Sequence, residues 1–245
     1  MISNIKFIII DFLNFLRNPT GSGNKKVNFL YYVFVYFLVY FFSMCLYVGI
    51  IILYNVIAVP CDLVKEHLQP INNSLFVIFG VVLAPIIEEL SFRYPLKYTK
   101  NALFIGLSFF TISAFFTNQT TISSHHNISY FAHKLTNPHF LYFLFAILLI
   151  CIVTRFEKVN VFLSNIWDKY LIFIIYLLAA YFAYLHFELP QTAKNLIWIP
   201  PLVLPYFVSA LYFSYIRLKL NLRYSILLHM IGNLIFFILT LKPFS

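Results

Sequence analysis

Residues 29–56 read FLYYVFVYFLVYFFSMCLYVGIIILYNV and contain no charged side chain. A helix of about 20 apolar residues is long enough to cross the hydrocarbon core of a bilayer. The stretch exceeds that length, so it predicts a membrane-spanning helix. We therefore interpret the rest of the chain as part of a membrane protein.

The composition supports this interpretation. Hydrophobic residues make up 62% of the chain and charged residues only 10%, whereas a soluble domain carries about 25% charged residues. The net charge of +9 is typical of basic loops that flank spans and face anionic lipid. We therefore expect a lipid bilayer as a partner and no nucleic acid. Cys45, Cys61 and Cys151 show no metal-motif spacing and are expected to be small apolar residues.

The apolar runs predict an all-α fold, a polytopic membrane helical bundle of about seven transmembrane helices. Pro200, Pro201 and Pro205 are expected to kink the sixth span. The seven spans are residues 29–56, 75–94, 103–116, 140–153, 170–187, 197–215 and 225–241.

Residues 1–20 are expected to form an N-terminal interfacial helix, and residues 27–245 a single membrane-embedded domain. Ile5, Ile8, Phe12 and Leu16 recur at helical spacing, with polar residues such as Asp11 between them. This pattern is typical of an amphipathic helix that lies on a bilayer. It is too interrupted for a signal peptide, so none is expected.

Basic residues in the loops predict the orientation. With the N-terminus inside, alternate loops place 13 basic residues on the inner side and 4 on the outer side. This bias predicts a multi-pass cell-membrane protein with a cytoplasmic N-terminus, and heavy use of Phe, Ile, Asn, Tyr and Lys suggests a bacterial source. The inner set is Lys6, Arg17, Lys25, Lys26, Arg93, Lys97, Lys100, Arg155, Lys158, Lys169, Arg217, Lys219 and Arg223, and the outer set is Lys65, Lys134, Lys194 and Lys242.

Three ionisable residues close the second span. Ionisable groups within a membrane are costly and usually face a cavity, pair with one another or mark a functional site. Glu89 and Arg93 are four residues apart, so they can form an ion pair on one helix face. Glu88 is rotated by about 100° from them. It can therefore face a different partner and is a candidate general base.

Two predicted spans supply possible partners for Glu88. Phe182 and His186 lie one helical turn apart in the fifth span, and His229 and Asn233 lie one turn apart in the seventh. A histidine and an amide on one face are two donors that could hold the oxyanion of a tetrahedral intermediate. Each pair alone is also compatible with a hydrogen-bonded bridge between helices.

In this order, the three motifs resemble the pattern of the CPBP family, which comprises CAAX prenyl proteases and bacteriocin-processing (Abi) proteins. The motifs are Glu88-Glu89-x-x-x-Arg93, Phe182-x-x-x-His186 and His229-x-x-x-Asn233. The resemblance covers mainly residues 75–100 and 175–240. The sequence departs from the pattern at Tyr94, where the family commonly has glycine, and in the long segment 101–169 between the first two motifs.

The resemblance implies an intramembrane glutamic endopeptidase that acts on a membrane-associated peptide or protein substrate. It implies that Glu88 activates a water, that His186 assists it, and that His229 and Asn233 stabilise the oxyanion. Glu89, Arg93 and Phe182 would support the site. No cofactor is expected in this mechanism.

Three alternatives remain open. Glu88, His186 and His229 form a set that zinc accepts. A non-catalytic membrane protein for bacteriocin immunity or scaffolding could retain the fold and use the polar residues only to join helices. A proton-coupled transporter also uses membrane Glu and His residues. His125, His126 and His133 are expected to lie in a solvated loop.

Overall fold

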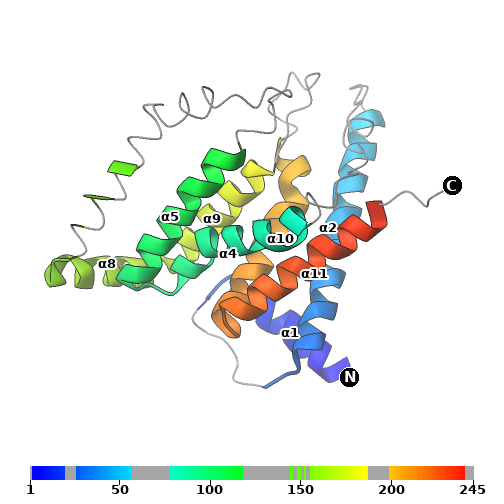
Figure 1. Ribbon diagram of the computed structural model, residues 1–245. Coiled ribbons are helices and arrows are strands. Elements are labelled where there is room, and N and C mark those ends of the chain that lie inside the picture. Colours follow the sequence, from blue (N-terminus) through cyan, green and yellow to red (C-terminus); the bar gives the residue numbers. More distant parts are fainter. Residues whose placement is uncertain are drawn as a thin grey trace, which may run out of the picture. The chain divides into compact units, whose positions relative to one another are not determined.

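The structure, a computed structural model, describes residues 2–19, 26–56, 78–117, 144–145, 148–149, 152, 155–186 and 199–240. Every regular element that it describes is helical, which confirms the all-α prediction (Figure 1). The predicted span 140–153 and the histidine-containing loop fall almost entirely outside these residues.

The chain forms two compact units. Unit 1 comprises residues 1–85 and 172–245, and unit 2 comprises residues 86–171. The helices that lie in unit 1, or almost entirely in it, are α1 (Ile2–Phe15), α2 (Phe29–Val56), the π-helix η2 (Phe79–Leu83), α9 (Leu171–Leu185), α10 (Ile199–Lys219) and α11 (Leu222–Thr240). Unit 2 holds most of α4 (Ala84–Phe92), the 3-10 helix η3 (Tyr94–Leu96), α5 (Lys100–Thr117) and α8 (Glu157–Lys169).

Most of the predicted spans are helices within a few residues of the predicted bounds, whereas their crossing of a membrane stays a prediction. The helix predicted for residues 29–56 is α2 with the same bounds, and the predicted N-terminal helix is α1. Helix α10 continues past the predicted end at residue 215, because Arg217 is buried and Lys219 forms a buried ion pair. Pro200 and Pro201 lie in its first turn, where a missing backbone N–H is tolerated, whereas Pro205 lies inside the helix.

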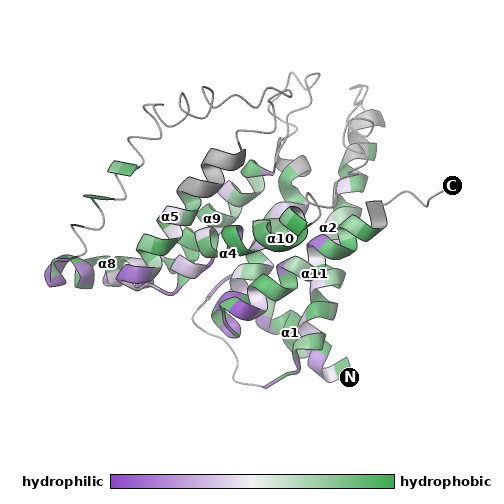
Figure 2. Ribbon diagram, viewed as in Figure 1, coloured by the Kyte–Doolittle hydropathy of each residue, from purple (hydrophilic) through white to green (hydrophobic). Residues whose placement is uncertain are grey.

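One helix in the described part of the chain is long and apolar enough to cross a membrane. It is the stretch Phe29–Ile50 of α2, and the count rises to two if the consecutive helices α8 and α9 are taken as one broken span. Figure 2 shows mostly hydrophobic residues along α2 and α9, whereas α8 also carries hydrophilic ones.

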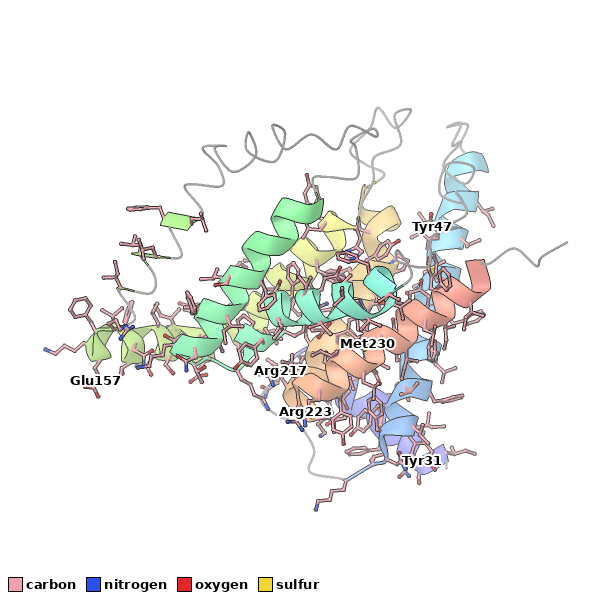
Figure 3. The ribbon with its side chains drawn as sticks, in the orientation of Figure 1. Tyr31, Tyr47, Glu157, Arg217, Arg223 and Met230 are labelled. Atoms are coloured by element: carbon pink, nitrogen blue, oxygen red, sulfur yellow. The ribbon has the colours of Figure 1, made fainter. Side chains whose placement is uncertain are left out.

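Helix α10 lies at the centre of unit 1, where it contacts α1, α2 and α11. Tyr212, Tyr215 and Ile216 are fully buried along it. The Tyr212 hydroxyl donates to the Tyr32 carbonyl of α2 at 2.9 Å. Ser225 of α11 donates to the Phe213 carbonyl at 3.0 Å, which closes the turn between α10 and α11. Figure 3 shows Arg217 and Arg223 near this turn.

A buried ion pair attaches α1 to the end of α10. Asp11 and Lys219 approach to 2.8 Å, and their side chains are 5% and 6% exposed. The Tyr215 hydroxyl also donates to Asp11, at 2.8 Å. Asp11 therefore lies on the buried face of α1, together with Ile8 and Phe12. The predicted position of α1 on a bilayer surface stays a prediction.

In unit 2, η3 packs against α5. Helix α4 ends before Pro95, which lacks a backbone N–H. Between the predicted fourth and fifth spans, where no element was predicted, Glu157–Lys169 form helix α8. Its apolar residues are interleaved with Lys158, Asp168 and Lys169, so it contains no uninterrupted apolar run.

We expect Gly106→Ala to destabilise unit 2. A methyl group at Gly106 would overlap the Pro95 ring and lie 3.4 Å from the Leu90 carbonyl oxygen. Such overpacking costs about 1–3 kcal/mol, measurable as a lower melting temperature in detergent. Gly49→Ala is the control, because nothing lies within 4 Å of the added methyl group. Equal melting temperatures for the two variants would contradict the close contact.

Asp11→Ala should destabilise unit 1 strongly, because it leaves Lys219 buried without its carboxylate. Removing one partner of a buried ion pair costs about 3–5 kcal/mol. The comparison is Asp168→Ala, which removes an exposed aspartate of α8 and should change stability by less than about 0.5 kcal/mol. Chemical denaturation of both variants measures the difference, and a similar loss in the two would argue against the ion pair.

Candidate functional site

Glu88 lies in a helical run that begins as a π-helix. The N–H of Ala84 donates to the Phe79 carbonyl, which is the i to i+5 bond of η2, and α4 follows without a break. Single π-turns inside helices are frequent at functional sites. Glu88 follows Gly80 by eight residues in this run, and it belongs to unit 2 because the boundary falls after Pro85.

Glu89 and Arg93 form the ion pair that their spacing predicts. Arg93 Nη1 lies 3.6 Å from Glu89 Oε1, and both side chains are completely buried. Glu88, one residue before, is only partly buried. The two neighbouring carboxylates therefore occupy different environments, and the Arg93 guanidinium compensates the charge of Glu89.

His186 lies at the turn that ends α9. Its Nδ1 lies 2.8 Å from the Phe182 carbonyl oxygen. Because a carbonyl only accepts hydrogen bonds, Nδ1 is the protonated nitrogen, and in the neutral ring Nε2 carries the lone pair. The ring also stacks on Tyr206 of α10, with 5.1 Å between centroids.

His229 lies between two aromatic side chains in unit 1. Its ring stacks on Phe213 of α10 at a centroid distance of 4.5 Å, and it meets the Phe182 ring of α9 edge-on, with 6.0 Å between the ring centroids. His229 is only 4% exposed. These contacts hold the imidazole in one orientation at the junction of α9, α10 and α11.

Asn233, one turn after His229, joins α11 to η2. Its Nδ2 donates to the Gly80 carbonyl oxygen at 2.9 Å. This bond connects positions 153 residues apart in the chain. An amide nitrogen carries two hydrogens, so one N–H of Asn233 is committed to Gly80 and a second can serve another acceptor.

Unit 1 thus brings together residues of two of the three motifs. Phe182 contacts both His186 and His229, at ring distances of 4.3 Å and 6.0 Å, and Asn233 contacts the segment just before Glu88. The remaining motif residues, Glu88, Glu89 and Arg93, lie in unit 2. Their position relative to the histidines stays a prediction.

Gly80, Tyr206 and Phe213 were missed by the sequence patterns. An isolated glycine in an apolar helix can indicate that another segment approaches the backbone closely. The sequence therefore contained an indication that Gly80 is a contact position. Tyr206 and Phe213 offered none, because aromatic residues are abundant throughout the chain. Which of them contacts a histidine depends on how α9, α10 and α11 pack.

The site residues that lie in unit 1 can supply hydrogen-bond donors and a proton acceptor. His229 and Asn233 can donate to a developing negative charge, and Nε2 of His186 can accept a proton. No three His, Cys, Asp or Glu side chains gather as a metal-binding group among the residues that the structure describes. The zinc alternative involves residues of both units and stays a prediction.

Comparison of this chain with protein-family models, with curated proteins and with solved structures finds no match. The resemblance to the CPBP family therefore rests on the three motifs themselves.

Asn233→Leu should loosen the contact between α11 and η2. Leucine is similar in size but donates no hydrogen bond, and a typical hydrogen bond contributes about 0.5–1.5 kcal/mol, which suits this partly buried contact. We expect faster hydrogen exchange in residues 79–84 than in the wild type. Asn165→Leu, at an exposed position of α8, is the control and should leave this exchange unchanged. Unaltered exchange in Asn233→Leu would show that the bond does not hold η2.

Proposed function

We propose that this chain is a multi-pass membrane protein and an intramembrane endopeptidase whose general base is Glu88. The proposal combines the three motifs with the geometry of unit 1. In this proposal, the base lies on the helical run from residue 78 to residue 92. The residues that assist the base lie on α9 and α11.

The observation that carries the proposal is the hydrogen bond from Asn233 to Gly80. This bond connects the third motif to the helical run that bears the first motif. Here Asn233 binds the backbone of that helix, while His229 of the same motif contacts Phe182 of the second motif.

In the proposed reaction, Glu88 takes a proton from a water as the water oxygen attacks the carbonyl carbon of the scissile peptide bond. His186 would accept a hydrogen bond from the same water through Nε2. The carbonyl oxygen becomes negatively charged and receives hydrogen bonds from His229 and the second N–H of Asn233. When the C–N bond breaks, Glu88 returns its proton to the departing amine.

Glu89 and Arg93 support this chemistry without taking part in it. Because the pair is fully buried and carries no net charge, it can anchor α4 in a low-dielectric region. Glu88 is less buried than Glu89, and the proposal assigns to it the role of the base.

The second candidate is a non-catalytic membrane protein for immunity or scaffolding. It is favoured by one observation: the Asn233 amide already bonds a backbone carbonyl. Such a bond joins helices whether or not a substrate is cleaved. Both candidates predict a stable bundle, and they differ only in whether Glu88 transfers a proton.

Glu88→Gln separates the two candidates. Glutamine keeps the size and hydrogen bonding of the side chain but cannot take a proton from water. We expect membranes that contain wild-type protein to yield new peptide N-termini, identified by terminal-amine proteomics. The yield of these termini should fall at least about 100-fold in Glu88→Gln, since general-base catalysis contributes at least that factor.

Glu157→Gln is the matched control, because Glu157 is an exposed carboxylate at the first residue of α8 (Figure 3). It should retain the wild-type termini. Equal melting temperatures of the two variants would show that the loss is not caused by unfolding. An unchanged set of termini in Glu88→Gln would exclude the proteolytic function and favour the non-catalytic one.

A further inference from the structure

Helix α8 has two apolar edges that lie in different surroundings. Val159, Leu163 and Trp167 recur every four residues on one edge and are partly buried. Phe162, Ile166 and Tyr170 recur with the same spacing on the next edge and are exposed. We call these last three residues the outer stripe.

The first edge is covered by unit 2 itself. The Tyr98 hydroxyl donates to Asn160 Oδ1 at 2.9 Å, and the Tyr98 ring lies 5.7 Å from the Trp167 ring. These contacts attach α8 to the segment between η3 and α5. They fix the rotation of α8 about its axis, and so determine which side chains point away from unit 2.

The outer stripe is strongly apolar for an exposed surface. Phe162 is 61% exposed and Tyr170 48%, and Phe156, just before the helix, is 62% exposed. The opposite arc of the helix carries Asn165 and Asp168, which are also exposed. The polar arc also bears one exposed apolar residue, Val161, so apolar and polar side chains of α8 are largely, but not completely, on different sides.

Basic side chains surround the outer stripe. Lys158 lies one turn before Phe162 in the same row, and the Lys169 ammonium lies 5.3 Å from the centre of the Tyr170 ring. Residues 155–170 hold three basic and two acidic side chains, and Lys97 and Lys100 of the same unit are exposed as well. Lysine beside tyrosine or tryptophan is typical of the boundary between hydrocarbon and anionic headgroups.

We propose that α8 is an interfacial helix whose outer stripe is embedded in the headgroup region of an anionic bilayer. The positive charge around the stripe complements anionic lipid. The same positive charge would repel a second copy of this surface, so self-association through the outer stripe is disfavoured. The proposal requires that the chain be at a membrane, for which α2 is long and apolar enough, and it is independent of proteolysis.

The test uses the full chain in lipid vesicles. Cys45, Cys61 and Cys151 are replaced by alanine, and a single nitroxide label is attached to Phe162→Cys or Ile166→Cys. Collision rates with oxygen, which concentrates in hydrocarbon, and with a water-soluble nickel complex report the depth of the label. A label at Asn165→Cys, exposed on the polar arc, is the control.

We expect oxygen collisions to exceed nickel collisions several-fold at positions 162 and 166, and the reverse at position 165. The difference should be larger in vesicles that contain phosphatidylglycerol than in pure phosphatidylcholine. The double variant Lys158→Glu and Lys169→Glu should abolish this lipid preference at position 166, whereas Lys6→Glu of α1 should preserve it.

Two results would overturn the proposal. Equal nickel accessibility at positions 162, 165 and 166 would mean that the outer stripe lies in water. Spin–spin broadening at positions 162 and 166 that disappears on dilution with unlabelled protein would mean that a second copy covers the stripe. The two positions are labelled in separate variants. If one variant misfolds, the other still tests whether the outer stripe is embedded in lipid.

Discussion

The hydrogen bond between Asn233 Nδ2 and the Gly80 carbonyl links the candidate site to the fold. A polar group placed in an apolar bundle must be bonded within the protein, because neither lipid nor hydrocarbon side chains can replace water. The amide of α11 meets this requirement by binding the π-helix that leads into Glu88. Moving either helix along its axis would leave both groups unsatisfied, so one bond restricts how α11 and η2 can slide past each other.

The same requirement accounts for the buried polar groups elsewhere in unit 1. Asp11 is tolerated on the buried face of α1 because Lys219 and Tyr215 both bind it. Tyr212 lies at the centre of the bundle because its hydroxyl reaches a backbone carbonyl of α2. The apolar residues around α10 favour compaction without specifying alignment, whereas these directional bonds specify which turns of neighbouring helices lie side by side.

Local patterns predicted a large part of the fold. The bounds of α2 follow from an uninterrupted apolar run, and the pairing of Glu89 with Arg93 follows from their spacing on one helix. The patterns failed where burial depends on distant residues. Asp11 resembled a solvent-facing residue of an amphipathic helix, and no helix was predicted where α8 lies, because charged residues interrupt its apolar positions. In each case the missing information was the partner, Lys219 for one and Tyr98 for the other.

By itself, the sequence determined the helical class, the positions of most helices and the identity of the motif residues, because these depend on hydrophobicity and on spacing within one helix. Only the tertiary structure decided that Phe182 contacts both histidines, that Phe213 and Tyr206 stack on them, and that Asn233 binds Gly80. Apart from the contact of Phe182 with His186, which lie one turn apart at the end of α9, these contacts join residues of different helices. Their geometry follows from the packing of whole helices, which no local pattern encodes.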